Sequence, residues 1–328
     1  MSAGLDQVTA VASRSVDRLA GRLVALSVAV IVALGVAGCS SRRTAPDAHA
    51  ELATAITLIR AHDLYAGNVD WSKAAARAYE DLGSRTAPSA AYLPIADLLS
   101  QLGDMHAKLL HPGVSASASF DPAARLPSAQ ITGRFAILTM PGWRGDPAQG
   151  EPYVRAVWQV LASGHPACGW VIDLSDNEGG DLLPMLAGVE PFLTLTQPVG
   201  GTVPGHPTEM FGVNAGTVSF GKDRQAYGSP PPRVVEPVAV LTGPSTASSG
   251  EWLVLALHSN PAVRTFGEPT SGEPTSPDLF QLPDGAQLEL AVSASVDTRG
   301  TQHTAPLVPD FVTTTPLADA EQWLTGQC

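Results

Sequence analysis

The chain has 328 residues, of which 44% are hydrophobic and 15% are charged. This composition predicts a folded protein with a substantial core, and the length suits one large or two modest domains. Acidic residues outnumber basic residues by 31 to 19, which gives a formal net charge of -12. Because so acidic a chain offers no basic surface to neutralise phosphates, we expect no nucleic-acid partner.

The first forty residues have the pattern of a secretion leader. Arginines at positions 14, 18 and 22 precede an uncharged apolar run over residues 23–36. This run is too short to span a bilayer comfortably, which favours a cleaved signal over a membrane helix. It ends in Val-Ala-Gly-Cys at residues 36–39, which resembles the lipobox of bacterial lipoproteins.

The leader predicts both processing and location. We expect a lipoprotein signal peptide over residues 1–38, lipidation of Cys39 and a short tether over residues 39–46. The protein would then be extracytoplasmic and anchored to the cell membrane through its lipid. A plain signal peptide or a short anchor is the alternative interpretation.

Two further cysteines, Cys168 and Cys328, follow the leader. They could form a disulfide in an oxidising compartment, or remain one buried and one terminal thiol. Sequence gives no geometry to choose between these states. No cluster of His, Cys and Asp has ligand spacing, so we predict neither a metal nor an organic cofactor.

Residues 47–112 are predicted to form a small helical subdomain. Apolar residues recur at helical spacing in three segments of this region. Asp47, Asp70 and Ser89 are the expected N-caps of the corresponding helices.

Residues 113–328 are predicted to form an α/β core, because short apolar strands there alternate with helices. The segment 198–232 is rich in Gly and Pro and is interpreted as a surface excursion, with a hairpin as one option. The expected strands are 135–139, 169–174, 237–241, 263–266, 279–282 and 287–293, and the expected helices are 153–163, one ending near 192–193, and 252–257.

The order strand, glycine turn, helix occurs twice, over residues 173–183 and 241–257. Each such turn places backbone N–H groups and a helix N-terminus at the carboxyl edge of a sheet. Ligand sites of open α/β sheets collect at that edge. We therefore expect the functional site where these two turns meet.

Four segments resemble the tail-specific, or carboxy-terminal processing, serine peptidases and the tricorn core peptidases. They are Leu-Gly-Asp-Met-His at 102–106, Asp-Leu-Ser-Asp-Asn-Glu-Gly-Gly at 173–180, Thr-Ala-Ser-Ser-Gly-Glu at 246–251 and Phe-Gly-Glu-Pro-Thr-Ser-Gly at 266–272, followed by a late Pro-Asp at 309–310. The resemblance implies a ClpP/crotonase-like α/β core with a small N-terminal helical subdomain. The interval 109–131 is too short for the PDZ module that many relatives carry.

The resemblance implies that Ser248 is the nucleophile. A hydroxyl at the start of a helix, after a turn of small residues, is exposed to substrate in a positive backbone field. The alternative is that Ser248 only caps the helix. The oxyanion hole would consist of the backbone N–H groups of Gly179, Gly180 and Ser249.

A serine nucleophile needs a base. Processing-type relatives use a lysine shortly after the nucleophile, but Glu273 occupies the matching position here. Tricorn-type relatives use the histidine of the Asp-x-His segment, which is His106. An imidazole suits a general base at neutral pH. A histidine bonded only to backbone is the structural alternative for His106.

A third group should orient the histidine. Tricorn-type relatives use a glutamate, and counting back from the late Pro-Asp leads to Gln302 and His303 instead. Asp297, Glu268 or Glu273 could substitute. Ser175 also replaces an arginine that relatives carry in the Asp-Leu turn.

These motifs lead to one main hypothesis, a serine hydrolase that cleaves peptides or proteins in the cell envelope through an acyl-enzyme. The departures at Ser175, Glu273 and residues 302–303 leave open a peptidase fold that binds peptides without efficient turnover. An esterase that uses the same serine on a small substrate is the third possibility.

Overall fold

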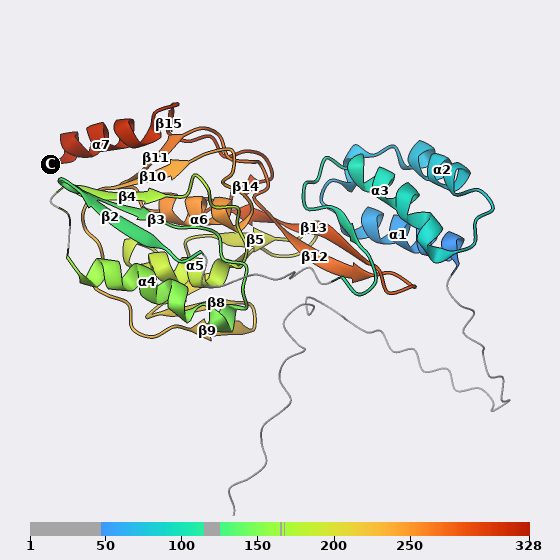
Figure 1. Ribbon diagram of the computed structural model, residues 1–328, viewed down its shortest axis with the longest axis horizontal. Helices are drawn as coiled ribbons and strands as arrows, with labels where there is room; N and C mark the ends of the chain where they lie inside the picture. Colours follow the sequence, from blue (N-terminus) through green and yellow to red (C-terminus); the bar gives the residue numbers. More distant parts are fainter. Residues whose placement is uncertain (1–46, 115–124, 165, 167) are drawn as a thin grey trace, which may run out of the picture. The chain divides into compact units, whose positions relative to one another are not determined.

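The computed structural model describes residues 47–114, 125–164, 166 and 168–328 (Figure 1). The predicted signal peptide, Cys39 and the tether over 39–46 lie outside the described residues. Within the described ranges, every helix is too short or too polar to cross a membrane.

The main sheet contains six strands in the order β15-β11-β10-β4-β3-β2. Its neighbouring strands from β15 to β3 run parallel, and β2 pairs antiparallel with β3 at one edge. The expected α/β fold class is therefore confirmed. The bounds are β2 Ser128–Thr132, β3 Phe135–Thr139, β4 Gly169–Asp173, β10 Val238–Thr242, β11 Val263–Gly267 and β15 Phe311–Val312.

Helices cover both faces of this sheet (Figure 1). Strand β10 shows the reason, because its alternate residues point to opposite faces. Val238 and Val240 join the core beneath α4 (Glu151–Ala162), α5 (Leu182–Val189) and α6 (Ser249–His258). Ala239 and Leu241 instead pack against Ala320 and Leu324 of α7 (Pro316–Gln327). A strand buried on both faces has the continuous apolar sequence seen here.

The N-terminal region forms α1 (Ala48–His62), α2 (Trp71–Leu82) and α3 (Tyr92–Ser100), with short 3-10 helices at Ala66–Asn68 and Pro88–Ala91.

The side chains of Asp47 and Asp70 accept hydrogen bonds from the first turns of α1 and α2, as N-caps do. The expected cap at Ser89 is wrong. Ser89 lies within the 3-10 helix that starts at Pro88 and runs directly into α3, so no cap separates the two.

A second sheet is centred on β13 (Gln287–Val296), the longest strand. Leu288 and Leu290 of β13 pack into the core of the N-terminal helices. Residues 294–296 pair with β5 at the other end of the same strand. The remaining strands of this sheet are β1 Lys108–Leu110, β5 Gly200–Thr202, β6 Glu209–Met210, β12 Thr275–Gln281 and β14 Gln302–His303.

The segment 198–232 is more buried than its Gly and Pro content predicted. It supplies β5 and β6 and a three-stranded meander of β7 (Gly212–Asn214), β8 (Thr217–Phe220) and β9 (Asp223–Ala226). Phe211, Val213 and Val218 are buried in the main core. The hairpin option is thus confirmed, since β7 and β8 pair antiparallel. The surface placement is wrong for these buried residues, because turn residues obscured the apolar anchors.

Cys168 and Cys328 form a disulfide, with their Cα atoms 5.1 Å apart. The bond joins the residue after α7 to the residue before β4. It links segments separated by 160 positions in sequence, so it removes conformational freedom from the unfolded chain.

Glu51 of α1 is fully buried against the β12–β13 turn. The N–H of Asp284 donates to Glu51 Oε2 at 3.2 Å. Burial, together with the neighbouring Asp284, raises the pKa of Glu51 to about 8. Glu51 is thus protonated in the folded protein at pH values where the unfolded chain has released its proton.

This raised pKa makes stability depend on pH. The contribution of Glu51 is fully present below its usual pKa of 4.5 and is lost as the pH rises to about 8. The neutral amide in Glu51→Gln removes this dependence. Between pH 5 and 8 the unfolding free energy of wild type should therefore fall more steeply with pH than that of the variant, and the two slopes should differ by about 1 kcal/mol per pH unit. Urea denaturation at several pH values measures both slopes; equal slopes would contradict the assignment.

Candidate active site

Ser248 occupies a strained position at the start of α6. It follows the short turn after β10, and its backbone has φ 51° and ψ -122°. Ala215 is the other non-glycine residue with positive φ in the described part of the chain. Such a conformation costs about 1–3 kcal/mol and persists only where surrounding contacts impose it.

Hydrogen bonds from several segments hold this turn. The N–H of Ser248 donates to Glu251 Oε2 at 2.9 Å, and the N–H of Ala247 donates to the carbonyl of Asn177 at 3.0 Å. The Thr246 hydroxyl donates to the carbonyl of Leu174 at 2.8 Å. The two glycine turns predicted to meet are therefore bonded directly to each other.

The Ser248 hydroxyl meets the imidazole of His106. Ser248 Oγ lies 3.2 Å from His106 Nε2, within hydrogen-bond distance. His106 is 7% exposed and lies between α3 and β1. Because β1 and β12 both pair with β13, the second sheet brings His106 beside Thr275, at the start of β12. The structure thus joins the two residues that the sequence singled out as nucleophile and base.

Three side chains besides Ser248 lie around the imidazole of His106. Its Nδ1 lies 3.0 Å from Thr275 Oγ1 and 4.0 Å from Asp104 Oδ1. Its Nε2 lies 3.7 Å from Glu273 Oε2. The hydrogen-bond partner at Nδ1 is thus a hydroxyl, and the buried carboxylate of Asp104 lies farther from the same nitrogen.

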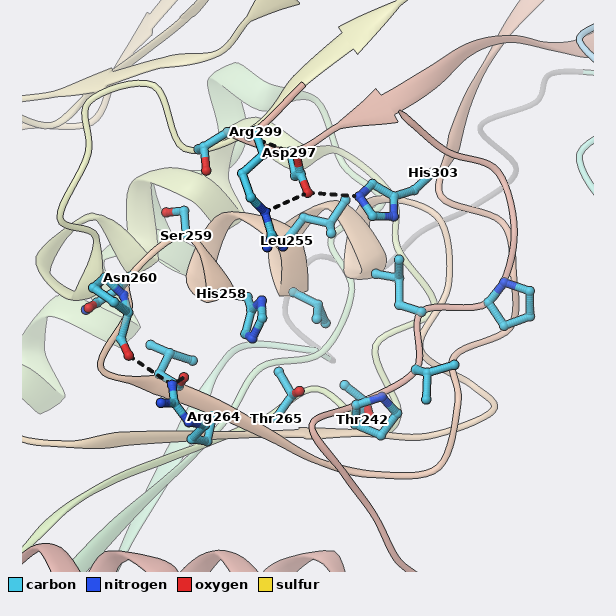
Figure 2. A pocket seen from close by; sticks show the side chains of 18 residues that line it. Thr242, Leu255, His258, Ser259, Asn260, Arg264, Thr265, Asp297, Arg299 and His303 are labelled. Atoms are coloured by element: carbon cyan, nitrogen blue, oxygen red, sulfur yellow. Dashed lines mark hydrogen bonds and ion pairs between the residues drawn. The ribbon is translucent and has the colours of Figure 1, made fainter. Parts of the chain in front are cut away.

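The orienting groups expected at residues 302–303 lie elsewhere. His303 Nε2 is 3.4 Å from Asp297 Oδ2, which also pairs with Arg299. Figure 2 shows these three side chains at a separate cavity of about 590 Å³, whose lining includes neither Ser248 nor His106. Among the described residues, neither Gln302 nor His303 contacts the imidazole, so their expected role is not matched by the geometry.

The sequence did not predict Asp104 and Thr275 as partners of His106. Asp104 stands within the Asp-x-His segment, so its sequence position carried a signal. Thr275 could be found only from the register of β12 against β13.

The expected oxyanion donors differ in their present hydrogen bonds. The N–H of Gly179 donates to Asn177 Oδ1 at 2.9 Å, so it is already engaged. Among the described residues, the N–H groups of Gly180 and Ser249 have no acceptor. The hydroxyl of Ser249 donates to the Gly180 carbonyl at 2.6 Å and holds these two residues together. Gly180 and Ser249 are therefore the N–H groups that remain available to a substrate oxygen.

Gly179 is required because its backbone lies close to the Ser248 turn, and not because its N–H is available to a substrate. A Cβ at this residue would lie 2.9 Å from Ser248 Cβ and 2.7 Å from the carbonyl of Ala247. Its φ of 84° also favours glycine.

Glu251 connects Ser248 to the loop beside His106. Its fully buried carboxylate accepts the N–H of Ser248 on one side and the N–H groups of Gly272 and Glu273 on the other. The Thr270 hydroxyl is its fourth donor. Burial raises the pKa of Glu251 to about 7, against the lowering effect of these hydrogen bonds. The carboxylate supports the site and does not contact Ser248 Oγ.

Replacing this carboxylate tests its structural role. Each oxygen of Glu251 accepts two hydrogen bonds, so the NH₂ group of Glu251→Gln would face donors at one of them. We expect the variant to lose about 2 kcal/mol of unfolding free energy and at least about tenfold in kcat/KM. Denaturant unfolding and steady-state kinetics measure the two effects. Glu268→Gln, in the same loop, is the matched control; a Glu251 variant that behaves like this control would refute the role.

The site contains no evident metal-binding group. Among the residues that the structure describes, no three His, Cys, Asp or Glu side chains converge as a metal site would require.

A strained serine at a helix N-terminus, within hydrogen-bond distance of a buried histidine, is the arrangement found in serine hydrolases. The chain belongs to the family described as Peptidase family S41, whose family model matches residues 134–313. The predicted resemblance to serine-type peptidases is thus confirmed. The matched range includes Ser248 and both glycines of the Gly179 turn, and begins after His106.

Individual relatives support this assignment. The chain is 29% identical over 205 residues to the nisin-resistance protein of Lactococcus lactis subsp. lactis, over 61% of this chain and 63% of that protein. The match therefore spans slightly less than two thirds of the relative. A solved structure of a lipoprotein from Streptococcus agalactiae has a TM-score of 0.69 at 21% identity, covering 90% of this chain and all of the other.

The photosystem II D1 C-terminal processing protease shares the fold, with a TM-score of 0.52 at 14% identity. That comparison covers 80% of this chain and 92% of the protease.

Proposed function

We propose that this protein is an extracytoplasmic serine peptidase, held at the cell membrane by a lipid on Cys39, with Ser248 as nucleophile and His106 as base. The observation that carries the proposal is the 3.2 Å contact between His106 Nε2 and Ser248 Oγ. The strained backbone of Ser248 supports it, since such strain clusters at functional sites.

The geometry suits acyl-enzyme chemistry. His106 Nε2 takes the proton of Ser248 as Oγ attacks the substrate carbonyl, and later gives that proton to the departing amine. The N–H groups of Gly180 and Ser249 would stabilise the oxyanion that forms. Water then attacks the acyl-enzyme with His106 again as base, which releases the acid product and restores Ser248.

The relatives suggest a location and a first substrate. The fold neighbour from Streptococcus agalactiae is a lipoprotein, which supports the lipid anchor proposed from the Val-Ala-Gly-Cys segment at 36–39. Nisin, named in the Lactococcus relative, is the first peptide to test. We retain the division into signal peptide 1–38, tether 39–46, helical subdomain 47–112 and core 113–328 as part of this proposal.

Hydrolysis by the full-length protein tests the chemistry. Nisin and a peptide library are incubated with wild type, Ser248→Ala and His106→Ala, and products are identified by mass spectrometry. Both variants should lose at least about 10³-fold in kcat/KM, because nucleophile and base act as a unit. Ser249→Ala keeps the backbone N–H and serves as control, with a much smaller loss. Equal hydrolysis by wild type and Ser248→Ala would contradict the mechanism.

Lipid anchoring makes a separate prediction. Cys39→Ala should move the protein from the membrane fraction to the supernatant, because the acyl chains supply its membrane affinity. Ser40→Ala is the adjacent control and should stay membrane-bound. Fractionation followed by immunoblotting measures the distribution; unchanged membrane association of Cys39→Ala would refute the anchor.

A peptide-binding protein without turnover is the second candidate. It is favoured by the hydroxyl, rather than a carboxylate, that contacts His106 Nδ1. In that case a peptide should bind wild type and Ser248→Ala equally, with no product from either. Hydrolysis of small esters but of no peptide would instead assign an esterase.

A further inference from the structure

We propose that Asp104 is a positioning residue that selects the catalytically competent tautomer of His106, acting through space while Thr275 makes the direct hydrogen bond. The inference rests on the proposed roles of Ser248 and His106. It assigns to Asp104 the task that a directly bonded carboxylate performs in Ser-His-Asp triads.

The contact with Thr275 does not determine the tautomer by itself. To act as a base towards Ser248, the imidazole of His106 must carry its proton on Nδ1 and leave Nε2 free to accept. A threonine hydroxyl can both donate and accept a hydrogen bond. At 3.0 Å, Thr275 Oγ1 can therefore partner either a protonated or an unprotonated Nδ1. A further influence on the Nδ1 side must decide between them.

Asp104 has the position and the fixed orientation to set the tautomer of His106. Its Oδ1 lies 4.0 Å from His106 Nδ1, and its side chain is only 1% exposed. Oδ1 also accepts the backbone N–H of His106 at 2.9 Å, and Oδ2 accepts the N–H of Ala291 at 3.1 Å. A negative charge held in this way attracts a proton on Nδ1 and repels a lone pair there, and burial strengthens both effects.

A second carboxyl, Asp63, lies behind Asp104. Asp63 is buried, and its Oδ1 accepts the N–H of Tyr65 at 2.8 Å. Burial, together with the nearby Asp104, raises the pKa of Asp63 to about 7. In weakly acidic solution Asp63 is therefore mostly protonated and adds little charge beside Asp104.

Glu273 opposes Asp104 from the other side of the ring. Its Oε2 lies 3.7 Å from Nε2, where it would favour the unproductive tautomer. Its side chain is 17% exposed, so solvent screens its charge more than that of Asp104. Both carboxylates stabilise the imidazolium that forms during attack, but only Asp104 favours the base-competent neutral ring.

The test is ¹⁵N NMR of the imidazole of His106 in the full-length protein, at a pH where the ring is neutral. Ring shifts report which nitrogen carries the proton, and His106→Gln assigns the signals. Wild type should carry the proton on Nδ1. Asp104→Asn should move at least a third of the population to Nε2 and lower kcat about 10–10³-fold with little change in KM. Glu273→Gln and Thr275→Val, which keep the Asp104 charge, should retain the Nδ1 proton.

Several results would overturn the proposal. They are a wild-type ring protonated on Nε2, an unchanged tautomer in folded Asp104→Asn, or a switched tautomer in Thr275→Val. The wild-type and Thr275→Val measurements decide even if Asp104→Asn does not fold. Tautomers that follow Asp104 in a protein without hydrolytic activity would uphold the positioning role and overturn the proposed function. Hydrolysis by a protein whose His106 tautomer does not depend on Asp104 would uphold the proposed function and overturn the positioning role.

Discussion

The hydrogen bond between His106 and Ser248 joins residues that are 142 positions apart, and much of the fold serves to make it. Ser248 belongs to the main parallel sheet through the turn after β10, whereas His106 belongs to the second sheet through β1. Strand β13 connects the N-terminal helices with β5, and the residue before β5, Val199, is buried in the core of the main sheet. A shift of that strand's register would therefore displace the histidine from the serine.

Hydrogen bonds on both sides of the site hold the strained backbone of Ser248 in place. The carbonyl of Asn177 and the carboxylate of Glu251 accept the N–H groups of Ala247 and Ser248. Glu251 also binds the loop that carries Glu273, so the position of the serine and the surroundings of the imidazole depend on one buried acid. Because these groups are already ordered in the folded protein, the free energy of ordering them is spent during folding and not during a reaction.

Sequence periodicity predicted β3, β4, β10 and β11 of the main sheet, because strands buried on both faces are continuously apolar. It did not predict the two edge strands, β2 and β15. The family resemblance of their segments, and not periodicity, led to Ser248 and His106, which the structure places within hydrogen-bond distance. Sequence failed to predict the buried anchors of 198–232, where turn residues obscured Phe211 and Val213, and the groups beside Nδ1 of His106. Counting along the chain led to residues 302–303, whereas His106 Nδ1 is reached by Thr275 and Asp104. Such contacts depend on strand pairing, which a single sequence does not encode locally.

The central claim is that Ser248 is the activated nucleophile of an S41 peptidase. The most direct measurement is mass-spectrometric mapping of the residue modified when full-length wild-type protein reacts with a fluorophosphonate. The account predicts one phosphonylated residue, Ser248, with no adduct in a His106→Ala sample treated identically. No adduct on the folded wild type, or an adduct on another residue such as Ser249, would contradict it.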